Sequence, residues 1–170
     1  MEQTNTPQLS LKEKIGYGLG DTASNLYFKF FEVFLVYYYT DIFGLNPAVM
    51  GTMFLVANLW DAVNDPIMGA IADRTNTSKG KYRPYLLWFA IPYGITGWLI
   101  FANFDFLADP GNKVIYAYAT FILFKMVYTA INVPYSAMMG VISPNAEDRQ
   151  ELGRFRSVSY THLTLPTSIQ

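Results

Sequence analysis

Four long apolar segments constrain the fold of this chain more than any other feature of its sequence. They cover approximately residues 23–43, 47–72, 85–104 and 114–141. Each has at least about 20 residues, the length that an α-helix needs to cross the hydrocarbon core of a bilayer. Four such segments in a chain of 170 residues disfavour a soluble core. The sequence therefore predicts an all-α, polytopic membrane protein.

The composition agrees with a membrane protein and excludes several kinds of chemistry. Charged residues make up 15% of the chain, whereas about 25% is usual in soluble domains. There is no cysteine, which excludes disulfides, thiol catalysis and cysteine metal sites. The first 25 residues are polar, so no cleavable signal peptide is expected.

Basic residues outside the apolar segments lie almost entirely on one side of the predicted topology. Nine precede the first segment, separate the second from the third, or follow the fourth, and Lys113 alone lies on the other side. These nine are Lys12, Lys14, Arg74, Lys79, Lys81, Arg83, Arg149, Arg154 and Arg156. Cytoplasmic loops of membrane proteins carry such an excess. We therefore expect a multi-pass protein of the inner or plasma membrane with a cytoplasmic N-terminus.

The second segment contains three polar residues, Asp61, Asn64 and Asp65, followed directly by Pro66. Each charge near the bilayer centre costs about 2.5 to 3.5 kcal/mol on insertion scales, so such residues usually serve a function. The spacing i, i+3, i+4 places the three side chains on one helical face. Pro66 has no N–H, which frees the carbonyl of Ala62. Together these oxygens predict a site for a hard monovalent cation, against the alternative of a polar face satisfied by neighbouring helices.

The fourth segment carries a stripe of polar residues at helical spacing. Pro134 lies near this stripe and is predicted to interrupt the helix there. Its members are Lys125, Tyr128, Thr129, Asn132 and Ser136. Side chains of these types recognise sugars through hydrogen bonds and aromatic faces, although polar residues also join helices in ordinary bundles. We interpret the stripe, together with the polar residues of the second segment, as the lining of a water-filled cavity.

Lys125 lies near the middle of its segment and has no acidic residue within four positions. A lysine in a spanning helix usually pairs with another group. Asp61 and Asp65 are the expected partners, and snorkelling of the lysine to the interface is the alternative.

Several motifs in this chain resemble one transporter family. The run Trp60-Asp-Ala-Val-Asn-Asp-Pro-Ile-Met-Gly69 is similar to the second-helix motif of the glycoside–pentoside–hexuronide:cation symporters, the melibiose permease family of the major facilitator superfamily. Similar matches in the same order are Tyr17-Gly-Leu-Gly-Asp-Thr-Ala-Ser-Asn25, Tyr37-Tyr-Tyr-Thr-Asp41, Tyr128-Thr-Ala-Ile-Asn-Val-Pro-Tyr135, and the loop from Gly69-Ala-Ile-Ala-Asp-Arg74 to Gly80-Lys-Tyr-Arg-Pro84. The resemblance covers about residues 10–157.

The resemblance implies a twelve-helix fold in two six-helix bundles, with alternating access around a central sugar and cation site. This chain would supply the first four transmembrane helices and the start of a fifth. Residues 1–22 would form the cytoplasmic N-terminus and the start of helix one, and residues 23–157 a partial N-terminal bundle. Residues 158–170 resemble a translated sequencing adapter, so we expect them to be an artefact rather than native sequence. The C-terminal helices of the same protein would then be missing partners.

The resemblance also assigns roles to individual residues. The cation ligands on this basis are Asp61, Asn64, Asp65 and Thr129, which would hold Na⁺ if the protein is sodium-coupled. The sugar-site or gate positions are Asn25, Tyr128, Asn132 and Arg156. The cytoplasmic gate is expected to involve Asp73, Arg74, Lys81 and Arg83.

Two departures from melibiose permease modify these expectations. Asn25 and Asn132 replace carboxylates that hold the sugar, so a neutral pentoside, another glycoside or an anionic hexuronide fits at least as well as melibiose. Lys125 stands where melibiose permease has a glycine. A fixed cation there would compete with Na⁺, which gives the hypothesis that Lys125 favours H⁺ coupling or weakens Na⁺ coupling.

The predicted function is therefore uptake of a sugar coupled to Na⁺ or H⁺, without covalent chemistry and without a cofactor other than the co-transported ion. The expected partners are the sugar, the monovalent cation and the lipid bilayer, but no nucleic acid. Two alternatives stay open: a non-transporting membrane scaffold or sensor, and an intramembrane aspartyl-type enzyme that uses Asp61 and Asp65 as a dyad. The enzyme is disfavoured because the two acids lie one turn apart on one helix.

Overall fold

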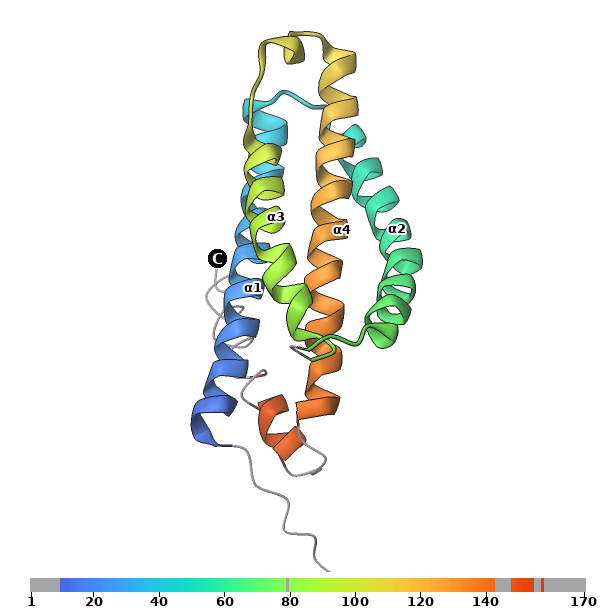
Figure 1. Cartoon of the computed structure of the whole chain (residues 1–170). Helices are drawn as coiled ribbons and strands as arrows, with labels where there is room; N and C mark the ends of the chain where they lie inside the picture. Colours follow the sequence, from blue (N-terminus) through green and yellow to red (C-terminus); the bar gives the residue numbers. More distant parts are fainter. Residues whose placement is uncertain (1–9, 79, 143–147, 155–156, 158–170) are drawn as a thin grey trace, which may run out of the picture. The chain divides into compact units, whose positions relative to one another are not determined.

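The computed structural model describes residues 10–78, 80–142, 148–154 and 157. Four long helices dominate this part of the chain (Figure 1). They are α1 (Leu11–Tyr37), α2 (Pro47–Arg74), α3 (Arg83–Phe101) and α4 (Pro110–Ile142). A π-helical turn, η1 (Tyr38–Ile42), follows α1, and a short 3₁₀ helix, η2 (Asp105–Ala108), precedes α4. The described residues include no strand, so the all-α prediction is confirmed.

Each predicted segment overlaps one of the four helices, and the first also covers η1. Among the described residues, α3 and α4 are each long and apolar enough to cross a membrane. Helix α1 does not reach the same hydropathy because it includes charged residues such as Lys14 and Glu32, and α2 does not because it includes Asp61 and Asp65.

The starts of α1 and α2 follow from local capping. Ser10 and Glu13 form a reciprocal capping box: the Ser10 backbone N–H donates to the Glu13 carboxylate at 2.9 Å, and the Glu13 N–H donates to the Ser10 hydroxyl oxygen at 3.4 Å. This pair starts α1 twelve residues before the predicted apolar segment. Asn46 caps α2 by accepting from the Ala48 N–H at 2.8 Å, and Pro47 occupies the first turn, where no N–H is needed.

Proline occurs inside three helices without ending any of them. Pro66 lies within α2, Pro92 within α3 and Pro134 within α4. Each removes one backbone hydrogen bond, but the flanking turns continue in the same helix. The prediction that Pro134 interrupts the fourth segment is therefore wrong, because the hydrogen bonds on either side of it are sufficient to keep α4 continuous.

The described helices fall into two compact units, of which residues 31–136 form the larger. Within it, α4 contacts α3 through aromatic stacking, with the Tyr93 and Phe124 ring centroids 5.2 Å apart. The Tyr116 hydroxyl also donates to the Leu99 carbonyl at 2.6 Å, near the end of α3 where carbonyls lack helical partners. On its other side α4 contacts α2, where the Thr52 and Tyr118 hydroxyls are 2.6 Å apart. Helix α4 therefore lies between α2 and α3, as Figure 1 shows.

The described residues among 1–30 and 137–170 form the other unit. Within it, the Lys14 ammonium pairs with Asp148 at 3.2 Å and Glu151 at 2.5 Å. Asp148 belongs to a helical stretch over residues 148–154, and its side chain is buried. The start of a fifth helix after Arg156 and the adapter-like residues 158–170 lie outside the described residues, so both stay predictions.

Candidate cation site

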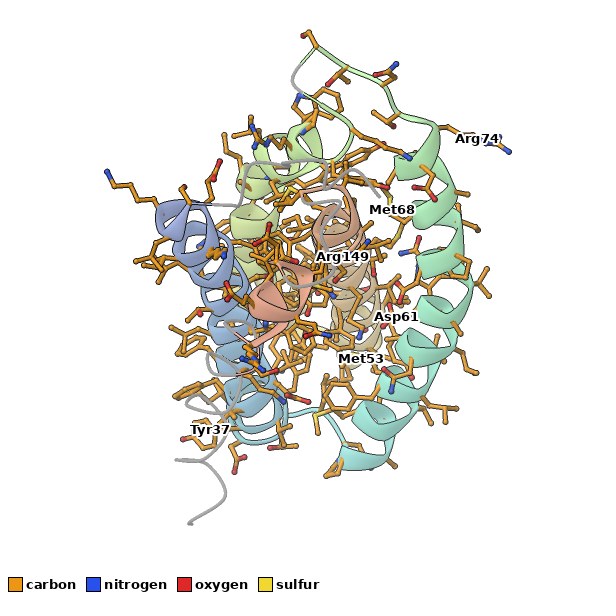
Figure 2. All side chains as sticks on the ribbon, turned by 90° about the horizontal axis from the view of Figure 1, so that it is seen from below. Tyr37, Met53, Asp61, Met68, Arg74 and Arg149 are labelled. Carbon is orange, nitrogen blue, oxygen red and sulfur yellow. The ribbon has the colours of Figure 1, made fainter. Side chains whose placement is uncertain are left out.

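Asp61 and Asn64 lie in the less exposed stripe of α2. Met53, Ala57 and Ala72 are buried, and Asp61, Asn64 and Met68 are half-buried between them, at spacings of three and four residues. Such spacing defines one face of a helix. Figure 2 shows Met53, Asp61 and Met68 on the side of α2 toward α4. The middle of this stripe is thus polar, with apolar side chains before and after it.

Asp65 and Thr129 meet across the α2–α4 contact. The buried Thr129 hydroxyl donates to Asp65 Oδ1 at 2.9 Å. Asp65 is otherwise exposed, so its carboxylate remains accessible next to a fixed hydroxyl. A carboxylate and a hydroxyl oxygen at this separation are suitable ligands for a hard cation. The geometry therefore brings together two of the four predicted cation ligands, one from each helix.

Asp61 pairs with Lys125. The Lys125 ammonium lies 2.5 Å from Asp61 Oδ2, and the exposed fractions of the two side chains are 12% and 20%. Asp61 Oδ1 is buried and accepts no hydrogen bond from the residues that the structure describes. The expectation that Lys125 pairs with an acid of the second segment is therefore confirmed, and the partner is Asp61 rather than Asp65.

Of the four predicted sugar-site residues, two lie on α4, one lies in the other compact unit, and one is outside the described residues. Tyr128 and Asn132 are half-buried on α4, and the Tyr128 ring lies 6.1 Å from the Tyr93 ring of α3. Asn25 is half-buried on α1 within the other compact unit, and Arg156 lies outside the described residues. A sugar site that combines these four residues accordingly stays a prediction.

Two of the residues predicted to form a cytoplasmic gate, Asp73 and Lys81, are in contact at the C-terminal end of α2, and the gate itself stays a prediction. The Lys81 ammonium lies 3.1 Å from Asp73 Oδ1, and the Tyr82 hydroxyl donates to the same oxygen at 2.7 Å. The hydrogen bond from Tyr82 and the neighbouring Lys81 ammonium both lower the pKa of Asp73. Arg74 points outward (Figure 2), and Arg83 is exposed; neither forms an ion pair with a described residue. The contact therefore contains two of the four predicted gate residues.

Tyr82 is the partner of Asp73 that the sequence prediction missed. It is buried and lies between Lys81 and Arg83 in the segment Gly80-Lys-Tyr-Arg-Pro84. A buried tyrosine hydroxyl usually finds a hydrogen-bond partner, which is the signal that identifies it. The sequence prediction relied on the charges of the loop and therefore selected the basic residues on either side of Tyr82.

Comparison with known proteins identifies the family. The family described as MFS/sugar transport protein matches residues 16–168 of this chain. The chain belongs to this family. The resemblance to the glycoside–pentoside–hexuronide:cation symporters is thus confirmed, and the intramembrane enzyme is not favoured because the family is one of transporters.

Three relatives illustrate the similarity. YagG, a candidate glycoside/cation symporter of Escherichia coli (strain K12), is 51% identical over 149 residues, which are 88% of this chain and 32% of that protein. The inner membrane symporter YicJ of the same organism is 44% identical over 90% of this chain and 33% of its own length. The isoprimeverose transporter of Lactiplantibacillus pentosus is 39% identical over 85% of this chain and 30% of its own length.

The chain spans about a third of the length of the curated relatives it matches, between 30% and 33% for these three. The α2–α4 contact is therefore part of a chain from a transporter family. The relatives in that family are about three times as long as the part that matches this chain. The roles of individual residues in the cation and sugar sites remain predictions at this point.

Proposed function

We propose that this chain forms part of a secondary transporter that couples sugar uptake to a monovalent cation, Na⁺ or H⁺. The observation that carries the proposal is the polar centre of the α2–α4 contact, where Asp65 accepts from Thr129 at 2.9 Å. In a membrane protein, carboxylates at such a position are retained for ions or substrates. Membership of a sugar-transport family supports transport rather than another use of these carboxylates.

The cation would bind at Asp65, with Thr129 and the half-buried Asn64 as the neighbouring oxygen ligands. Its charge would neutralise a carboxylate on α2 while its ligands come from both helices. Binding would therefore hold α2 and α4 in one arrangement. A sugar bound to that arrangement would raise the affinity for the cation by the same factor by which the cation raises the affinity for the sugar.

The sugar is proposed to be a glycoside, a pentoside or a hexuronide. Relatives that match this chain include an isoprimeverose transporter and a glucuronide carrier protein homolog. Asn25, Tyr128 and Asn132 would hydrogen-bond or stack on the sugar, with Arg156 as a gate or anion-binding group. Because Asn25 and Asn132 are uncharged, they would not repel a carboxylate on the substrate.

We propose that the protein lies in the cell membrane with its N-terminus in the cytoplasm. Nine basic residues against one support this orientation. Within the larger unit, the Lys113 ammonium donates to the Phe43 carbonyl at 2.9 Å, so the connections before α2 and before α4 lie together at one end. Because the chain has no cysteine, single cysteines at Asn76 and Asn112 test the orientation: a membrane-impermeant maleimide should label Asn112→Cys from outside and not Asn76→Cys.

Uptake by the complete gene product tests the proposed function. Cells that express it should accumulate a labelled glycoside, pentoside or hexuronide when a proton or sodium gradient is imposed. Asp65→Asn should abolish accumulation while the protein still inserts in the membrane. Absence of cation-driven uptake for every sugar of these classes would favour the scaffold or sensor instead.

A further inference from the structure

The ion pair between Asp61 and Lys125 divides the two carboxylates of α2 into two different environments. Asp61 lies 2.5 Å from a lysine of the same protein, whereas Asp65 contacts the uncharged hydroxyl of Thr129. One carboxylate is thus already compensated by a permanent positive charge, and the other is not. The sequence alone treats the two acids as equivalent members of one motif.

We propose that the Lys125 ammonium is a tethered cation that occupies Asp61 and keeps Na⁺ from binding there. This inference rests on the proposed function, since it concerns which cation the site accepts. An ammonium group and Na⁺ carry the same charge and compete for the same carboxylate oxygens. The ammonium has the advantage of proximity, because α4 holds it at the site and it pays no further loss of translational freedom.

The surroundings of the pair argue against a purely structural role. A buried ion pair stabilises a fold only when additional hydrogen bonds satisfy its remaining lone pairs. Asp61 Oδ1 is buried and has no hydrogen-bond partner among the described residues. A pair selected for stability alone would be expected to satisfy this oxygen or to be replaced by apolar residues of similar size.

The pair also fixes the charge of the site. Two carboxylates and one ammonium leave a net charge of −1, from Asp61, Asp65 and Lys125. One monovalent cation at Asp65 then makes the loaded site neutral. Without Lys125 the same loaded site would remain negative and would accept a second cation at Asp61. Lys125 would thus determine both the identity and the number of the coupled cations.

Thermal unfolding of the complete gene product in detergent tests this inference without relying on transport. The experiment compares NaCl with choline chloride at one pH and one ionic strength. For Lys125→Met, Na⁺ should raise the unfolding temperature by about 3 °C or more, because a ligand that binds the folded state stabilises it. The unsubstituted protein, in which Lys125 occupies Asp61 and only Asp65 is open to Na⁺, should gain at least about 2 °C less.

Two matched variants serve as controls. Lys113→Met removes another lysine of α4, one that contacts the Phe43 carbonyl and no described carboxylate, so it should respond to Na⁺ as the unsubstituted protein does. Asp61→Asn combined with Lys125→Met removes the carboxylate together with the lysine, so its Na⁺ response should fall back to that of the unsubstituted protein. If Lys125→Met does not fold, Lys125→Gln takes its place in the same comparison.

The inference is overturned if the unsubstituted protein gains as much from Na⁺ as Lys125→Met does, or if neither the Met nor the Gln variant responds. Sugar uptake separates this failure from failure of the proposed function. Cation-driven uptake by the unsubstituted protein with no Na⁺ response in the variants refutes the tethered-cation inference alone. Absence of uptake with any cation refutes the proposed function.

Discussion

Two carboxylates of α2 each pair with a lysine, and the two pairs differ mainly in their surroundings. Asp61 and Lys125 are 20% and 12% exposed in the middle of a helix contact, whereas Asp73 and Lys81 are 63% and 37% exposed at the end of α2. Water stabilises the separated charges of the second pair and not those of the first. The comparison shows that burial, rather than the presence of an ion pair, determines what removal of one partner costs.

The largest expected effect is that of Asp61→Asn. The substitution leaves the Lys125 ammonium in the α2–α4 contact without its carboxylate, which should cost about 3 to 5 kcal/mol of stability. Thermal unfolding of the complete gene product in detergent measures the loss. Adding Lys125→Met to the same protein should recover most of it, because the charge and its partner are then removed together. Equal stability of Asp61→Asn and the unsubstituted protein would contradict the buried pair.

Thr129→Val should have the next largest effect. Valine matches threonine in shape but cannot donate to Asp65, and a hydrogen bond to a charged group contributes about 1.5 to 3 kcal/mol. Thr120→Val is the matched control on the same helix, because the Thr120 hydroxyl donates to the neutral Tyr116 carbonyl at 2.7 Å. That control should lose only about 0.5 to 1.5 kcal/mol. Similar losses in the two variants would argue against a charged Asp65.

Lys81→Met should change the unfolding temperature much less than Lys125→Met measured in choline chloride. Both substitutions remove one ammonium from one carboxylate of α2, so their difference isolates burial. The remaining Asp73 carboxylate is hydrated and keeps its hydrogen bond from Tyr82. A loss as large as that of Lys125→Met would show that the Asp73 contact is protected from water.

The smallest effect is expected for Tyr82→Phe, and it should depend on pH. Tyr82 and Lys81 lower the pKa of Asp73, so their contribution to stability is present above the ordinary carboxyl pKa of about 3.9 and is lost as pH falls through the lower pKa of the folded protein. Unfolding measured between neutral and strongly acidic pH should show a shallower acid loss for Tyr82→Phe. Tyr85→Phe is the control, because the Tyr85 hydroxyl meets the Thr75 hydroxyl instead; an equal change in that variant would exclude Asp73 as the cause.

The sequence by itself determined the helices and their approximate ends. Four apolar runs of sufficient length leave a membrane protein little choice other than helices, because backbone groups in lipid must be satisfied within their own segment. Asn46 and Pro47 mark the start of α2 through local capping. The position of Asp61, Asn64 and Asp65 on one face follows from helical periodicity alone, and the motif around them was sufficient to indicate the family.

The tertiary structure decided which groups meet. Helical periodicity places both Asp61 and Asp65 within reach of a neighbouring helix, but it does not give the axial register or the rotation of α4. These depend on how the side chains of the α2–α4 contact pack, and a shift of one turn along the axis would exchange the partners. The structure pairs Lys125 with Asp61 and Thr129 with Asp65, and it brings Tyr82 to Asp73. Contacts between helices that are distant in sequence depend on that packing. The spacing of residues along one helix does not determine it.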